Sequence, residues 1–202
     1  MLPVVVRPAN RSSGFTLVEV MIVIGIIAVL ISLAFSTVER RRAAVGIDQA
    51  AKDLMARIVE ARGLASIAGA RIGTARLVSA CASNPGAPEI RVWIDPAQNA
   101  YEVPKAVRMD NATDQMRVEC QRYDLGPLTR GDGRLVAPAG APMEFTFAAT
   151  GRVQVVAAPN PQNLFVQVAH RTEPMRSGFR VLPSGVLCSA SDPARFGCDE
   201  DR

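Results

Sequence analysis

The hydrophobic pattern divides the chain into one unbroken apolar run near the N-terminus and a longer remainder of mixed character. The run extends from Phe15 to Phe35, contains no proline, and has Glu19 as its only charged residue. A helix of about 21 residues is about 30 Å long, which matches the hydrocarbon thickness of a bilayer. The run therefore predicts one membrane-spanning helix at residues 15–36.

Apolar residues continue at helical spacing beyond the run. Their intervals of mostly three, four or seven residues would place them on one helix face: Val38, Val45, Leu54, Ile58, Ala61, Ala65 and Ala68. Gly69 and Gly73 are candidate stop signals. We therefore expect residues 37–70 to form an amphipathic continuation of the same helix.

From residue 71 onward the pattern changes to short alternating segments separated by glycine and proline. The predicted strands are residues 76–81, 90–95, 116–120, 143–147, 152–155, 164–168, 178–182 and 186–188. Two-residue alternation bounded by such turns predicts antiparallel hairpins. The expected fold class is α+β, in which the long N-terminal helix packs on an antiparallel β-sheet domain at residues 71–202.

Glu19 requires an explanation because a carboxylate inside a bilayer is costly, by about 2.5–3.5 kcal/mol at the centre and less near an end. It could lie one turn inside the helix and extend toward the lipid headgroups. Alternatively, it could have a cationic partner. Cleavage between Gly14 and Phe15 would create such a partner by freeing an α-ammonium group at the same depth.

The segment Gly14–Val20, with sequence GFTLVEV, resembles the class III signal of type IV pilins and type II secretion pseudopilins. In that family a prepilin peptidase cuts after the glycine and N-methylates the new terminal phenylalanine. The resemblance implies a leader peptide at residues 1–14, cleavage between Gly14 and Phe15, and N-methylation of Phe15. It also implies that Glu19 acts in assembly by pairing with the terminal amine of a neighbouring subunit.

Later segments are similar to the GspH/FimT group of minor pilins and pseudopilins. They are the helix end and first strand at residues 60–83, the Phe-x-x-x-Gly-Arg turn at residues 147–153, and the closing hairpin at residues 179–186. The resemblance implies a GspH/FimT-like domain at residues 71–202, although residues 99–141 match the group poorly.

The charge distribution does not by itself orient the chain in a membrane. The formal net charge is +4, and removal of a leader containing Arg7 and Arg11 leaves +2. These two arginines precede the apolar run, whereas Arg40, Arg41 and Arg42 follow it, so the positive-inside rule is ambiguous. The resemblance implies a single-pass protein of the bacterial inner membrane with its C-terminal domain in the periplasm.

The resemblance also implies that the four cysteines form disulfides, because the domain would then be extracytoplasmic. Four cysteines allow three pairings. The favoured set joins Cys188 to Cys198, which flank a short loop, and Cys81 to Cys120. The alternative is that two or more of them are free buried thiols.

No catalytic, cofactor-binding or metal-binding motif is recognisable in the sequence. There is no Cys-x-x-Cys pair, and the single histidine, His170, has no recognisable partner. We therefore expect a structural protein and not an enzyme. The resemblance implies a minor pilin or pseudopilin assembled into a type IV pilus or a type II secretion pseudopilus.

The partners implied by the resemblance are prepilin peptidase, other pilins or pseudopilins, the inner-membrane assembly platform and membrane lipids. An alternative function is DNA uptake, because some FimT-like minor pilins resemble DNA receptors. The candidate DNA contacts are Arg152, Arg171, Arg176 and Arg180. The alternative for these arginines is that they simply occupy the solvated face of a sheet.

Overall fold

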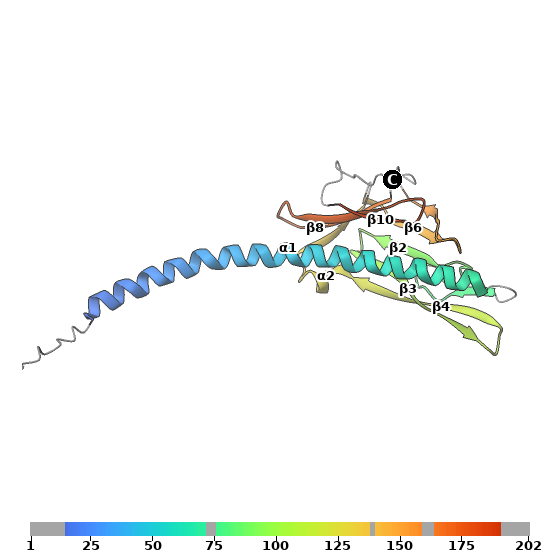
Figure 1. The fold of residues 1–202 in the computed structure, drawn as a ribbon, viewed down its shortest axis with the longest axis horizontal. Coiled ribbons are helices and arrows are strands. Elements are labelled where there is room, and N and C mark those ends of the chain that lie inside the picture. Colours follow the sequence, from blue (N-terminus) through green and yellow to red (C-terminus); the bar gives the residue numbers. More distant parts are fainter. Residues whose placement is uncertain (1–14, 72–75, 138–139, 159–163, 191–202) are drawn as a thin grey trace, which may run out of the picture. The chain divides into compact units, whose positions relative to one another are not determined.

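A computed structural model describes residues 15–71, 76–137, 140–158 and 164–190. The chain forms two compact units, Met1–Arg41 and Arg42–Arg202. Helix α1, from Leu17 to Arg71, crosses the boundary between them. Within the second unit, α1 is followed by two β-sheets (Figure 1). The predicted α+β class, a long N-terminal helix with a largely antiparallel β-sheet domain, is confirmed.

The six-stranded sheet has the order β1-β4-β3-β2-β6-β7. Its strands are β1 (Arg76–Ser79), β2 (Arg91–Asp95), β3 (Ala100–Asp110), β4 (Gln115–Asp124), β6 (Met143–Phe147) and β7 (Val153–Ala157). All neighbouring strands are antiparallel except β1 and β4, which are parallel. The expectation of purely antiparallel hairpins is therefore wrong for β1, because β1 pairs with a strand that is distant in the sequence and not with the next one.

The four-stranded sheet has the order β10-β9-β8-β5, and all its pairs are antiparallel. Its strands are β5 (Gly133–Val136), β8 (Leu164–His170), β9 (Arg176–Val181) and β10 (Leu187–Ala190). The short helix α2 (Leu125–Leu128) lies between β4 and β5 in the sequence.

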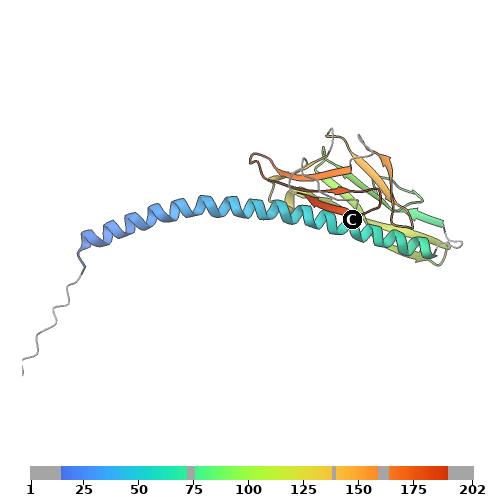
Figure 2. The same ribbon diagram turned by 45° about the horizontal axis from the view of Figure 1, so that its top comes forward.

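The second half of α1 lies along β3 and β4 (Figure 1, Figure 2). Apart from the adjacent pair Ala50 and Ala51, its buried residues recur every three or four positions: Ile47, Ala50, Ala51, Leu54, Ile58, Ala61, Ala65 and Ala68. Five of the eight are alanines, whose small side chains let the helix approach the strands closely. They pack with residues of both sheets in one hydrophobic core.

The predicted helix face is correct from Leu54 to Ala68 but wrong at Val38, which is 42% exposed, and at Val45, which is 53% exposed. At the helical period of 3.6 residues, the face that contains Leu54 continues toward the N-terminus through Ala51, Ala50 and Ile47. Val38 and Val45 therefore lie on the opposite side of the helix from Leu54.

The region that matches the GspH/FimT group poorly, residues 99–141, contains β3 paired with β4, the longest strand pair among the described residues. The predicted strand at residues 116–120 lies within β4, whereas β3 was not predicted. The register shifts between Pro104 and Ala106, which places Lys105 in a bulge. A bulge reverses the alternation of side chains along a strand. The simple apolar–polar pattern that identifies strands is therefore interrupted here.

Asn99 joins the two sheets. Its backbone has a φ of 52°, a conformation that asparagine tolerates better than most residues. Its side-chain amide nitrogen donates to the carbonyl oxygen of Gly133 at 3.0 Å, and its amide oxygen accepts from the backbone nitrogen of Leu135 at 2.7 Å. The asparagine side chain thus pairs with the edge of β5 in place of a neighbouring strand.

Candidate functional site

The N-terminal candidate site begins at Phe15, because Gly14 lies outside the described residues. Helix α1 starts at Leu17, and the backbone nitrogen of Glu19 donates to the hydroxyl of Thr16 at 3.3 Å. Thr16 and Glu19 have the Thr-x-x-Glu spacing of a capping box, in which a hydroxyl satisfies a free backbone N–H at the helix start. Glu19 is also an acid in the first turn, where the helix dipole favours negative charge.

The apolar part of α1 is exposed along its length. Among the described residues it is the one helix that is long and apolar enough to cross a membrane, and none of its most apolar stretch is buried. Phe15 is 83% exposed and Leu33 is 64% exposed. Exposure of so much apolar surface to water is unfavourable, at about 25 cal/mol per Å². These side chains therefore require lipid or other apolar helices around them.

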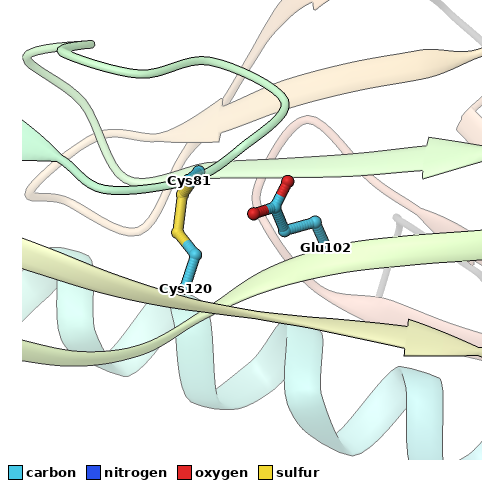
Figure 3. Close-up of side chains that lie close together, drawn as sticks. All are labelled: Cys81, Glu102 and Cys120. Atoms are coloured by element: carbon cyan, nitrogen blue, oxygen red, sulfur yellow. A yellow bond between two sulfur atoms is a disulfide. The ribbon is translucent and has the colours of Figure 1, made fainter.

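The predicted disulfide between Cys81 and Cys120 is confirmed, and its Cα atoms are 4.9 Å apart. Cys81 follows β1, and Cys120 lies in β4. The carboxylate of Glu102, in β3, points toward the disulfide (Figure 3). Its two oxygens accept hydrogen bonds from the backbone nitrogens of Ala82 at 2.7 Å and Ser83 at 2.8 Å. The disulfide and Glu102 therefore both anchor the loop that follows β1.

Cys188 is also a disulfide cysteine. Its expected partner, Cys198, lies outside the described residues. The pairing of Cys188 with Cys198 therefore stays a prediction.

The candidate DNA-contacting arginines lie in different parts of the second unit. Arg152 is exposed in the turn before β7. The backbone nitrogen of Val153, next to it, donates a hydrogen bond to the carbonyl oxygen of Pro183, which follows β9. Arg171 and Arg176 are exposed at the β8–β9 turn, at the other end of β9. Because a strand rises about 3.4 Å per residue, roughly 17 Å of strand β9 separates the two ends.

Arg180 lies within β9 and is half-buried. The four arginines therefore lie near both ends of β9 and within it, and their role in DNA binding stays a prediction.

The three segments that resemble the GspH/FimT group meet around Arg62 of α1. The Arg62 guanidinium donates to the carbonyl oxygen of Ser184 at 3.5 Å. A Cβ atom added at Gly151 would come within 2.8 Å of the Arg62 Nε, and one added at Gly185 within 3.1 Å. Both glycines have a positive φ, so they suit these turns in backbone conformation as well as in size. The sequence analysis assigned no role to Arg62.

A second polar cluster joins α1 to the six-stranded sheet. Arg57 forms an ion pair with Asp53 at 2.8 Å and donates to the hydroxyl of Tyr123 at 2.5 Å. The hydroxyl of Tyr101 donates to Asp53 at 3.2 Å, and the rings of Tyr101 and Tyr123 stack at 5.2 Å. Sequence reasoning missed this cluster, although the spacing of Asp53 and Arg57 is that of a helical ion pair.

The cluster perturbs the acid–base properties of its members. Burial, followed by the nearby Asp53 carboxylate, raises the pKa of Tyr101 above its ordinary value. Burial also raises the pKa of Tyr123. Burial, the largest single influence, opposes the charged form of Arg57, but the hydrogen bond to Asp53, the Asp53 charge and the two tyrosines together outweigh it, so the net direction of the Arg57 pKa is upward. Both tyrosines are therefore neutral, and Arg57 is charged, at physiological pH.

Comparison with known proteins identifies one match, which lies at the N-terminus. Residues 9–35 match the prokaryotic N-terminal methylation motif. No curated protein and no solved structure matches the chain. The motif and the exposed apolar helix together indicate a membrane-anchored chain with a type IV pilin-like class III signal, the kind of signal that prepilin peptidase processes.

Proposed function

We propose that this protein is a minor pilin or pseudopilin of the GspH/FimT type. Prepilin peptidase removes residues 1–14 and methylates Phe15. The mature subunit then enters a type IV pilus or a type II secretion pseudopilus from the inner membrane, with its C-terminal domain in the periplasm. In this role the protein is a structural subunit and not an enzyme.

The observation that carries this proposal is the exposed apolar run at the start of α1 together with the single acid in that run. The helix has apolar side chains on all sides, and Glu19 is the only charged residue between Phe15 and Phe35. In a bilayer or in a bundle of apolar helices, an isolated carboxylate is stabilised by a cationic partner. The α-amine released by cleavage before Phe15 is such a group. Pairing between the amine of one subunit and Glu19 of the next would set the register of assembly.

The test is substitution of Glu19 by alanine in the cell. Mass spectrometry of Glu19→Ala is expected to show normal cleavage and N-methylation, whereas its amount in sheared fibres should fall by about tenfold or more. Glu39→Ala is the matched control, because Glu39 is an exposed acid of the same helix outside the apolar run. Normal incorporation of Glu19→Ala into fibres would contradict the proposed role of Glu19.

A further inference from the structure

The buried surroundings of the Cys81–Cys120 disulfide contain a third side chain capable of ligation. Candidate ligand atoms of Cys81, Cys120 and Glu102 all lie within 4.8 Å of one another. They come from β4, β3 and the residues directly after β1, which are neighbours in one sheet (Figure 3). The paired strands therefore fix the relative positions of the three side chains.

Glu102 is a buried acidic residue whose register partner on β4, Arg122, forms its ion pair with Asp124 and not with Glu102. Glu102 is only 5% exposed, and its carboxylate accepts hydrogen bonds from two backbone N–H groups. Among the described residues, no lysine, arginine or histidine forms an ion pair with it. Buried charges in proteins are usually paired or bound to a metal. The two N–H groups orient the carboxylate and leave lone pairs on both oxygens, as hydrogen bonds to metal-binding carboxylates do.

We propose that the reduced chain binds a thiophilic divalent cation, such as Zn²⁺, through Cys81, Cys120 and Glu102. Zinc prefers four ligands at about 2.0–2.3 Å, which places the ligand atoms about 3.5–3.8 Å apart. After reduction, rotation of the two cysteine side chains about their Cα–Cβ bonds would have to separate the sulfur atoms to this spacing, from Cα atoms that are 4.9 Å apart. A water molecule completes the four ligands. The site and the disulfide exclude one another, since both use the same two sulfur atoms.

The chemistry of loading involves two steps. A phosphine reduces the disulfide with two electrons, which yields two thiols and, with one water, the phosphine oxide. Binding of Zn²⁺ then releases the two thiol protons to solvent, because the thiolate is the form that binds metal. Glu102 binds as the carboxylate.

The first test uses the full chain in detergent micelles, reduced with a phosphine, with Co²⁺ as a spectroscopic probe. The variant C188S/C198S removes the other two cysteines. Its reduced form is expected to bind one Co²⁺ per chain, with a thiolate-to-cobalt charge-transfer band that Zn²⁺ abolishes. The variant C81S/C120S should show no such band. A reduced C188S/C198S chain without the band would overturn the proposal.

The role of Glu102 is tested by Glu102→Gln in the C188S/C198S background. Loss of a metal ligand should weaken Co²⁺ binding by about tenfold or more, since loss of an outer-shell partner alone has effects of that size. The matched control is Glu119→Gln, which removes an acid next to Cys120 that pairs with Arg108 at the surface. Equal affinity of Glu102→Gln and the C188S/C198S parent would overturn the three-ligand site.

A third measurement needs no substitution. Because a ligand that binds only the folded state raises its stability, Zn²⁺ should raise the unfolding temperature of the reduced wild-type chain. It should leave the unfolding temperature of the oxidised chain unchanged. If Zn²⁺ changed the unfolding temperatures of the reduced and oxidised chains equally, or changed neither, the result would overturn the site. This outcome does not depend on whether any variant folds.

Discussion

The guanidinium carbon of Arg57 lies 3.9 Å from the centre of the Tyr123 ring. Arg57 is on α1, and Tyr123 is on β4, 66 positions later in the sequence. The guanidinium also donates a hydrogen bond to the Tyr123 hydroxyl and pairs with Asp53. One side chain thus combines a cation–π contact, a hydrogen bond and an ion pair where the helix meets the sheet.

Substitution of Arg57 by methionine should lower the free energy of unfolding by about 1–3 kcal/mol. It retains the apolar stem but removes the cation–π contact, the hydrogen bond to the Tyr123 hydroxyl and the ion pair with Asp53, which keeps only its hydrogen bond from Tyr101. Urea denaturation in detergent measures the change. Lys52→Met is the control, because Lys52 forms an exposed ion pair with Asp48, and such pairs contribute about 0–1 kcal/mol. Equal losses in the two variants would show that the Tyr123 contact contributes nothing.

Alkaline pH should destabilise the domain through Tyr101. The folded state raises the pKa of Tyr101, whereas the unfolded chain releases the phenolic proton near the ordinary pKa of about 10. Above about pH 10 the unfolded state therefore binds fewer protons than the folded state, and the free energy of unfolding falls as pH rises. Below this pH the contribution of Tyr101 is constant.

Tyr101→Phe removes this titration. The variant should be less stable than wild type at pH 7 by about 1 kcal/mol, because it loses the hydrogen bond to Asp53. Its stability should then decline less steeply between pH 10 and pH 11, as followed by circular dichroism. An identical alkaline slope in the two proteins would rule out Tyr101 as the titrating group.

Gly185→Ala should be more disruptive than Gly86→Ala, although the two glycines have similar φ values of 80° and 78°. A Cβ atom at Gly185 would overlap the carbonyl oxygen of Gly151, whereas a Cβ atom at Gly86 meets no atom within 4 Å. Gly86→Ala is expected to cost about 1–2 kcal/mol from backbone strain alone. Gly185→Ala should cost about 1–3 kcal/mol more because of the overlap.

Thermal unfolding of the two variants, compared with wild type, measures this difference. Similar unfolding temperatures of the two variants would indicate that the Gly151 and Gly185 turns can move apart with little loss of stability.

Removal of the Cys81–Cys120 disulfide should destabilise the second unit. The cysteines are 39 positions apart, and closing a loop of this length restricts the unfolded chain by about 2–4 kcal/mol. The double variant C81S/C120S, measured by urea denaturation under non-reducing conditions, should lose this amount. A loss below about 1 kcal/mol would mean that hydrogen bonds such as those of Glu102 hold the loop without the disulfide.

Short stretches of the sequence were sufficient to predict the elements whose structure depends only on neighbouring residues. The 21-residue apolar run between Phe15 and Phe35 predicts the exposed helix, because helix length and bilayer thickness are fixed quantities. The motif at Gly14–Val20 predicts the N-terminal signal, which the match over residues 9–35 supports. The helix face from Leu54 to Ala68 follows from the helical period and was predicted correctly.

Only the tertiary structure decided the features that join distant parts of the chain. The parallel pairing of β1 with β4 and the bulge at Lys105 leave no simple pattern in the sequence. Arg57 and Tyr123 meet because α1 and β4 pack together, and Glu102 approaches the disulfide because β1, β4 and β3 are neighbours in one sheet. The apolar pattern specifies which face of each element is buried. Which buried faces meet depends on the packing of the whole core, since many arrangements bury similar apolar area.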